Sequence, residues 1–89
     1  MNIQEFIDSF KSKGYYVGTW YVDLGSNAYI EYGFGYVTIR TMTASYVYEI
    51  LVSRIYIKNI REITFSENSM KLLVKNELGI VTIEVNLTC

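Results

Sequence analysis

The last third of the chain alternates apolar and polar residues with a period of two. Residues 61–66, 70–75 and 81–87 follow this pattern. Short polar segments at 67–69 and 76–79 separate the three runs. A period of two places every second side chain on one face of an extended strand, and short polar breaks are typical of hairpin turns. The pattern therefore predicts an antiparallel meander with one buried face.

The N-terminal segment Asn2–Lys13 has a different period. Its apolar residues recur at helical spacing and form one stripe, which consists of Ile3, Phe6, Ile7 and Phe10. Asn2 and Glu5 can form a capping box around the first turn, and Gly14 stands where a left-handed C-terminal cap is expected. We expect this helix to cover the sheet, because a sheet with one apolar face must bury that face against another element.

The segment that follows the helix is rich in tyrosine, valine and threonine, which favour strands. It predicts a strand over Tyr15–Asp23, in which Gly18 marks a bulge or a close approach by the helix. After a turn at 24–27, a second strand is predicted over Ala28–Gly33. The tripeptide Gly33-Phe34-Gly35 then forms a tight turn or a kink, because the apolar face changes phase across it.

Residues 43–53 fit a helix or a strand, and their β-branched and aromatic residues favour the strand. Lys58-Asn59 is predicted to be a bend before the meander. Together these patterns predict one α+β domain over residues 1–89, with the helix packed on a twisted antiparallel β-meander of about six or seven strands that can curl into a partial barrel. The predicted inward side chains are Ile3, Phe6, Ile7, Phe10, Ile30, Val37, Ile39, Ile63, Phe65, Leu72, Val74, Val81, Ile83 and Val85.

The composition argues against several kinds of chemistry. The chain has no histidine, which removes the commonest general base and metal ligand, and its nine acidic residues are scattered without metal-loop spacing. Its single cysteine, Cys89, cannot form an internal disulfide. We therefore expect no enzyme activity, no catalytic residues, no metal and no cofactor. The apolar runs are too short to cross a bilayer and no signal peptide is recognisable, so we expect a cytoplasmic protein without a membrane partner.

Tyrosine is unevenly distributed, since all nine tyrosines lie between Tyr15 and Tyr56. Tyrosine is a good strand former, and that property alone could explain the bias. The alternation, however, places several tyrosines on the more polar faces beside two charged residues. This predicts an interface with another protein or with a second copy of the chain as a homodimer. The predicted interface residues are Tyr15, Tyr21, Tyr29, Glu31, Tyr36 and Arg40.

A single-stranded nucleic-acid-binding surface is the alternative. Exposed tyrosine rings can stack on bases, and basic side chains can follow the phosphates. The candidate basic residues are Arg40, Arg54, Lys58 and Arg61. The net charge of −1 provides no strong global attraction for nucleic acid, so this alternative depends on the local arrangement of these four side chains.

The opening residues also carry a resemblance. Met1-Asn2-Ile3, Phe6-Ile7 and the run Lys11–Val17 resemble the start of a small phage-encoded anti-CRISPR family, whose members inhibit a type II CRISPR nuclease. The resemblance covers about the first 17 residues and implies a viral accessory protein that inhibits a host protein. That family is strongly acidic, whereas this chain is nearly neutral, so the resemblance implies no mimicry of nucleic acid and assigns no functional residue.

Overall fold

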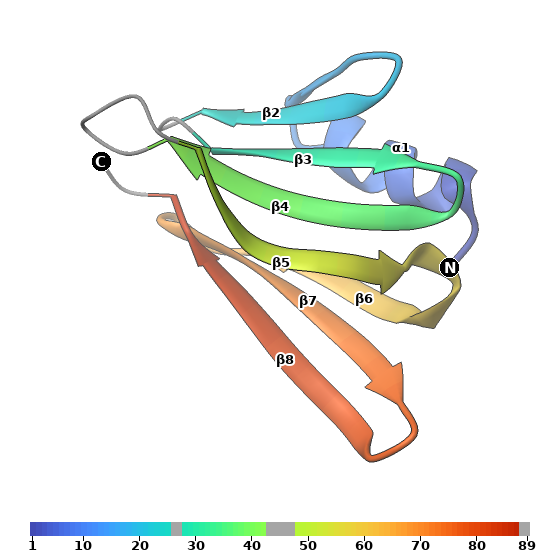
Figure 1. Cartoon of the computed structure of the whole chain (residues 1–89). Helices are drawn as coiled ribbons and strands as arrows, with labels where there is room; N and C mark the ends of the chain where they lie inside the picture. Colours follow the sequence, from blue (N-terminus) through green and yellow to red (C-terminus); the bar gives the residue numbers. More distant parts are fainter. Residues whose placement is uncertain (26–27, 43–47, 88–89) are drawn as a thin grey trace.

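The computed structural model of the chain describes residues 1–25, 28–42 and 48–87, with the backbone alone at 42 and 48–53. Within these residues, helix α1 (Ile3–Lys11) precedes eight strands, all paired antiparallel (Figure 1). The strands are β1 (Tyr16–Val17), β2 (Tyr21–Gly25), β3 (Ala28–Gly33), β4 (Tyr36–Met42), β5 (Tyr48–Tyr56), β6 (Ile60–Phe65), β7 (Ser69–Asn76) and β8 (Gly79–Asn86).

The predicted α+β class and the meander are confirmed, but the strands form two sheets instead of one. The larger sheet has the order β1-β2-β3-β4-β5 and the smaller one has the order β6-β7-β8, and they do not close into a barrel. The division occurs at the 3-10 turn Ile57–Asn59, where the bend at Lys58-Asn59 was expected. Ile57 and Ile60 are both buried, so the turn is held in the core while the chain leaves the larger sheet.

The helix forms for the local reasons that the sequence indicates. The Asn2 side chain accepts a hydrogen bond from the backbone N–H of Glu5 (2.8 Å), and the Glu5 carboxylate accepts one from the Asn2 N–H (2.9 Å). Gly14 has a φ of 87°, which glycine adopts with little strain. The expected capping box and the glycine cap are therefore both confirmed.

The prediction of one strand over Tyr15–Asp23 is wrong. Residues 18–20 form a turn, and β1 folds back on β2 with Tyr16 opposite Asp23. Gly18 lies in this turn, where the rings of Tyr16 and Tyr21 approach it, and it marks neither a bulge nor a contact with the helix.

The turn at Gly33-Phe34-Gly35 is confirmed. Phe34 and Gly35 have φ values of 52° and 83°, and Gly33 pairs with Tyr36 across them. Positive φ at both central residues is the geometry that suits a two-residue hairpin, since its twist matches that of the strands.

The predicted strand over 43–53 is confirmed for residues 48–53, which belong to β5, while residues 43–47 lie outside the described residues. The middle of the predicted turn at 24–27, residues 26–27, lies outside them as well. So does Cys89.

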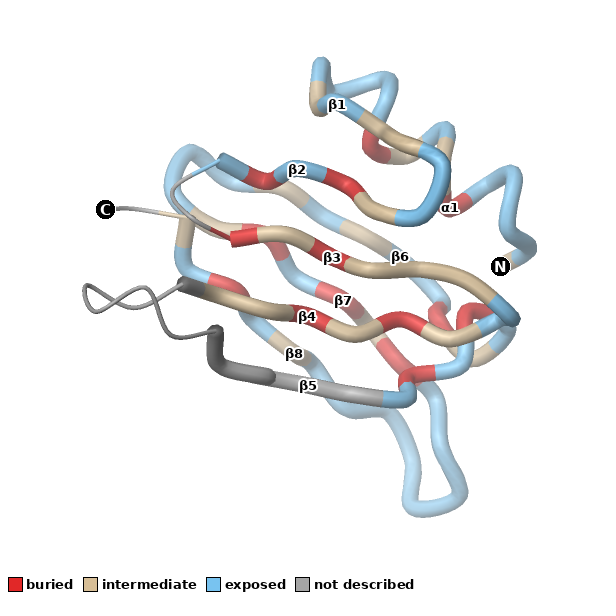
Figure 2. The backbone as a smooth tube through the Cα atoms, turned by 45° about the horizontal axis from the view of Figure 1, so that its top comes forward, coloured by how far each residue is buried: buried red, intermediate tan, exposed pale blue. Residues whose placement is uncertain are grey.

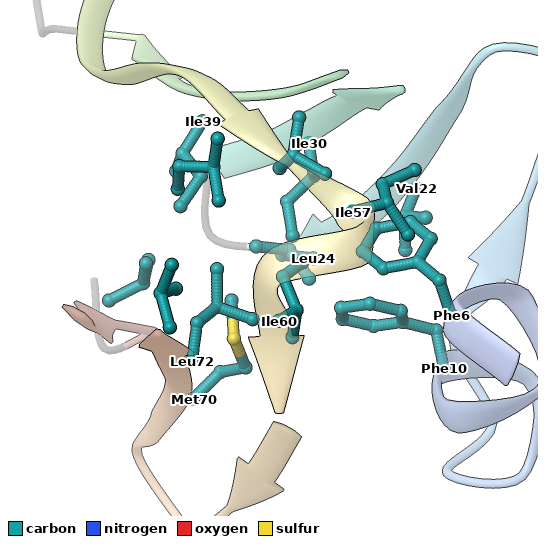
Figure 3. Close-up of a cluster of buried hydrophobic side chains, with 14 of the residues drawn as sticks. Phe6, Phe10, Val22, Leu24, Ile30, Ile39, Ile57, Ile60, Met70 and Leu72 are labelled. Carbon is teal, nitrogen blue, oxygen red and sulfur yellow. The ribbon is translucent and has the colours of Figure 1, made fainter. Parts of the chain in front are cut away.

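The core lies between the larger sheet on one side and the helix with the smaller sheet on the other. Figure 2 shows that the buried positions occur in the helix and in the strands of both sheets, and Figure 3 shows side chains of this cluster converging. The buried residues are Phe6, Phe10, Val22, Leu24, Ala28, Ile30, Val37, Ile39, Ile55, Ile57, Ile60, Met70, Leu72, Val74 and Val85.

Two residues of the predicted inward set are not in the core. Ile3 is 45% exposed because it lies at the start of the helix, ahead of the first residue that faces the sheet. Val81 is 43% exposed because the β7–β8 hairpin extends beyond the larger sheet, as Figure 1 shows. Four others pack only partly against the core, and these are Ile7, Ile63, Phe65 and Ile83.

Candidate protein-binding face

The outer side of the larger sheet carries most of the tyrosines. Because side chains alternate along a strand, the buried residues of β2, β3 and β4 point to the core and their neighbours point outward. The cross-strand register brings the outward residues of five strands onto one surface. We call this surface the outer aromatic face; its residues are Tyr16, Trp20, Tyr21, Tyr29, Glu31, Tyr36, Arg40 and Tyr56.

One half of the face is a row of aromatic rings. The ring centroid of Tyr21 lies 5.9 Å from that of Tyr16, 4.7 Å from that of Trp20 and 6.3 Å from that of Tyr29. Tyr16 is 62% exposed and Trp20 is 55% exposed. The row thus combines rings that support one another with large apolar surfaces that remain open to solvent.

The row depends on the turn between β1 and β2. The Gly18 N–H donates to the carbonyl of Tyr21 (2.8 Å), and the Tyr32 N–H donates to the carbonyl of Trp20 (2.8 Å). The Tyr32 hydroxyl donates to the carbonyl of Gly18. These bonds tie the turn to β3 and fix the backbone from which Trp20 and Tyr21 project.

An ion pair occupies the middle of the face. The Nε of Arg40, which is shielded from solvent, contacts the carboxylate of Glu31, and the Tyr29 hydroxyl donates to the same carboxylate (3.4 Å). Both charged side chains are about one-third exposed. Attraction between such groups is less screened than at a fully exposed site, so the pair can hold both side chains in one orientation.

A second aromatic pair lies at the other end of the face. Tyr36 and Tyr56 are cross-strand neighbours, and their ring centroids are 4.8 Å apart. A hydrogen bond with the Tyr56 side chain raises the pKa of Tyr36, and the positive charges of Arg54 and Lys58 oppose this rise. The Nζ of Lys58 lies 5.3 Å from the Tyr56 ring centroid, which permits a cation–π contact.

A shallow hollow of about 250 Å³ lies between the two aromatic groups. Its lining includes Trp20, Glu31, Tyr36 and the hairpin residue Phe34. The Phe34 side chain is fully exposed although its φ is positive. Bulky residues are uncommon in this conformation, and packing in the core does not explain this one.

Most of the predicted interface residues share this surface. Tyr21, Tyr29, Glu31, Tyr36 and Arg40 all lie on it. The expectation that Tyr15 shares it is wrong, because the Tyr15 ring stacks on Phe65 at 5.5 Å and packs against the core. Tyr15 precedes β1 and is therefore outside the alternation that orients the other tyrosines.

Sequence reasoning missed four aromatic residues of this region: Tyr16, Trp20, Phe34 and Tyr56. Tyr16 and Trp20 were missed because the prediction of a single strand over Tyr15–Asp23 does not include the β1–β2 turn. Phe34 could have been found, because a large apolar residue between two glycines of a hairpin has no core to fill.

The predicted basic residues do not form one group. Arg40 is paired on the outer aromatic face, whereas Lys58 and Arg61 line a hollow of about 310 Å³ together with Lys75. Arg54 lines a neighbouring groove with Tyr56. Of these residues, Arg54 and Lys58 are therefore the two that lie beside Tyr56, at one end of the face.

Within residues 1–25, 28–42 and 48–87, no cluster of three or more acidic or cysteine side chains has the arrangement of a metal site. Over the same ranges, no helix is long and apolar enough to cross a membrane. Comparisons of the chain with protein-family models, with curated proteins and with solved structures give no match.

Proposed function

We propose that this protein is a non-catalytic interaction module that binds a partner protein through the outer aromatic face. The observation that carries the proposal is the row of Tyr16, Trp20 and Tyr21 rings, in which Tyr21 supports Tyr16 and Trp20 while these two remain open to solvent. Tryptophan, tyrosine and arginine are enriched among the residues that contribute most to binding at protein interfaces, and the two aromatic ones bury large rigid surfaces at a small entropic cost.

The arrangement of the face supports a defined mode of binding. The hollow between Trp20 and Tyr36 can receive an apolar side chain of the partner, and the exposed ring of Phe34 can insert into the partner from the rim of the face. The Arg40–Glu31 pair offers both signs of charge at the centre, so that the partner's polar groups can be matched there without leaving a buried charge unpaired.

The resemblance of the opening residues supports a more specific version. In this version the protein is a phage accessory protein, and its partner is a host protein such as a type II CRISPR nuclease. Because the net charge is only −1, inhibition would come from occupying a protein surface with the aromatic face and not from imitating nucleic acid.

The test compares three forms of the protein: wild type, Trp20→Ala and Leu78→Ala. Leu78 is 98% exposed in the β7–β8 turn of the smaller sheet, whereas Trp20 belongs to the larger sheet's β1–β2 turn, so substitution of Leu78 is a matched loss of exposed apolar surface. Each form is used to capture proteins from host cells. Captured proteins and a purified type II CRISPR nuclease are then titrated directly, and nuclease cleavage is measured in the presence of each form.

We expect Trp20→Ala to weaken binding by at least about tenfold, as loss of an interface anchor does, and Leu78→Ala to bind like wild type. Inhibition of the nuclease with the same ranking would support the specific version. Equal binding by all three forms would overturn the proposal, and so would the absence of any protein whose recovery depends on Trp20.

Single-stranded nucleic acid is the second candidate ligand. It is favoured by the hollow that Lys58, Arg61 and Lys75 line, because Lys58 also lies over the Tyr56 ring of the Tyr36–Tyr56 pair. Stacking and phosphate contacts of this kind give an affinity that falls steeply as salt increases. Fluorescence anisotropy with single-stranded oligonucleotides tests this candidate: binding at low salt that Lys58→Gln weakens would support it, and no binding at low salt would exclude it.

A further inference from the structure

A second surface, separate from the outer aromatic face, lies along strand β8. This strand is the last of the smaller sheet, and within the described residues no strand pairs with its outer edge (Figure 1). It extends over eight residues, Gly79–Asn86, and it contains no proline and only one charged residue, Glu84. Edge strands are usually protected by charges, prolines or bulges, because their unpaired N–H and C=O groups can pair with another chain.

The backbone register shows which groups face the open edge. The Leu87 N–H donates to the carbonyl of Asn68 on the β7 side (2.7 Å). Because hydrogen-bonded and non-hydrogen-bonded pairs alternate in an antiparallel ladder, the odd-numbered residues of β8 bond to β7. The N–H and C=O groups of Ile80, Thr82 and Glu84 therefore point toward the open edge.

The side chains along this edge are unusually apolar for an exposed strand. Ile80 is 64% exposed and Val81 is 43% exposed. Val81 and Ile83 also line a groove of about 510 Å³ beneath the projecting hairpin, opposite Ile55 and Tyr56 of β5. Covering the edge of β8 would thus remove apolar surface from water on both faces of the smaller sheet.

We propose that the open edge of β8 binds a second copy of this chain, so that two β8 strands pair antiparallel around a twofold axis and join two three-stranded sheets into one. Antiparallel pairing of a strand with a second copy of itself is self-complementary. If a residue of one copy lies opposite a given position of the other, the residue at that position lies opposite the first residue's counterpart. A different protein would need a strand of matching pattern, whereas the second copy provides one by identity.

We place the twofold axis at Thr82. An axis at Thr82 sets Thr82 opposite itself and Ile80 opposite Glu84 of the second copy. This register pairs Ile80, Thr82 and Glu84 with the second copy and forms about six backbone hydrogen bonds, two for each pair. On the inner face it sets Val81 opposite Ile83, which are both apolar. An axis at Glu84 would place two carboxylates opposite each other, which is unfavourable.

The one acidic residue of β8 does not oppose this arrangement. Glu84 already pairs with Lys71 across the β7–β8 ladder, at 3.5 Å between Nζ and Oε2. Its charge is therefore compensated within its own chain. In the Thr82-centred register it would face Ile80, whose ladder neighbour is Lys75.

The test uses the position on the axis. Because Thr82 would face its own copy, Thr82→Lys places two ammonium groups opposite each other and Thr82→Glu places two carboxylates there. An equimolar mixture of the two variants restores opposite charges. Thr82 is exposed, so both variants are expected to fold, and circular dichroism checks that they do. Solution mass is measured by analytical ultracentrifugation over a range of micromolar concentrations.

We expect wild type to approach twice the mass of the chain, each single variant to dimerise at least about tenfold more weakly, and the mixture to recover the dimer. Thr64→Lys and Thr64→Glu are the matched controls, since Thr64 is an exposed threonine on β6, the other outer strand of the same sheet. They should leave the mass unchanged. A wild type that stays monomeric would overturn the proposal, and so would single variants that dimerise like wild type or a mixture that does not recover the dimer. None of these measurements involves the partner of the outer aromatic face, so this inference and the proposed function can fail separately.

Discussion

Gly18 and Tyr21 are in such close contact that no side chain fits between them. A β-carbon placed on Gly18 would lie 2.9 Å from Cε1 of Tyr21, closer than carbon atoms pack. The same β-carbon would lie 3.4 Å from Cε1 of Tyr16. The glycine of the β1–β2 turn is therefore what allows the Tyr21 ring to fold over the backbone and support Trp20.

Substituting this glycine should disturb the binding face more than the fold. In Gly18→Ala the Tyr21 ring must move, and we expect this movement to weaken its 4.7 Å contact with Trp20. We expect a loss of about 1 kcal/mol or less in the free energy of unfolding, because the contacting atoms belong to a movable side chain. Partner binding should weaken by about tenfold or more. Chemical denaturation and titration of the same preparations measure both effects, and unchanged partner binding would contradict the role given to the turn.

The Arg40–Glu31 pair should show measurable coupling. A double-mutant cycle with Arg40→Gln and Glu31→Gln isolates the interaction between the two side chains. In the free energy of unfolding, measured by urea denaturation of the four forms, we expect a coupling of about 1 kcal/mol, because the pair is partly shielded. We expect this coupling to fall as salt increases. Coupling near zero at low salt would mean that the pair does not hold the centre of the face.

The ionisation of Tyr36 should report its contact with Tyr56. Its pKa is raised above 10.0 chiefly by the hydrogen bond with Tyr56, so the contact stabilises the fold fully below pH 10.0 and is lost as the pH rises through the raised pKa. Tyr56→Phe should lower the pKa of Tyr36. Lys58→Gln should raise it, because the charge of Lys58 lowers it in the wild type. Nuclear magnetic resonance of labelled tyrosine measures both shifts, and a shift of the opposite sign in either variant would contradict the contact.

For three alanine substitutions in the smaller sheet, the loss in the free energy of unfolding should increase with the burial of the side chain. Leu72 is fully buried, Ile83 is partly buried and Ile80 is 64% exposed. We expect Leu72→Ala to cost about 2–5 kcal/mol in the free energy of unfolding, Ile83→Ala less than that, and Ile80→Ala within about 0.5 kcal/mol of wild type. Urea denaturation gives the three values. An Ile80→Ala loss as large as that of Leu72→Ala would contradict the exposed position of β8.

The parts of the fold that local patterns determine could be predicted from the sequence. The capping box of Asn2 and Glu5 needs only four consecutive residues. The turn at Phe34-Gly35 fixes the β3–β4 register, which sets Tyr29 opposite Arg40 and Glu31 opposite Thr38. The gathering of Tyr29, Glu31 and Arg40 on one face follows from that turn and from alternation alone.

The remaining features depend on tertiary packing. Nothing local shows that Ile57 and Ile60 are both buried, and this burial separates the two sheets. The fold-back at Gly18 is favoured by the hydrogen bonds of this turn with β3 and by the tyrosine rings that pack on the glycine. A pattern of alternating residues predicts neither of these contacts. Trp20 was therefore predicted to lie within a strand, although it lies in a turn and is a principal residue of the face.

The most direct test of the central claim follows the one tryptophan of the chain. Incorporation of a fluorinated tryptophan gives a single fluorine signal, from Trp20, even when a partner contains tryptophans of its own. The structure predicts that the chemical shift of this signal depends on the solvent in the free protein, because Trp20 is 55% exposed. Saturation with the partner protein should remove this dependence. A signal that is shielded in the free protein, or one that the bound partner leaves unchanged, would contradict the claim that the outer aromatic face is the binding surface.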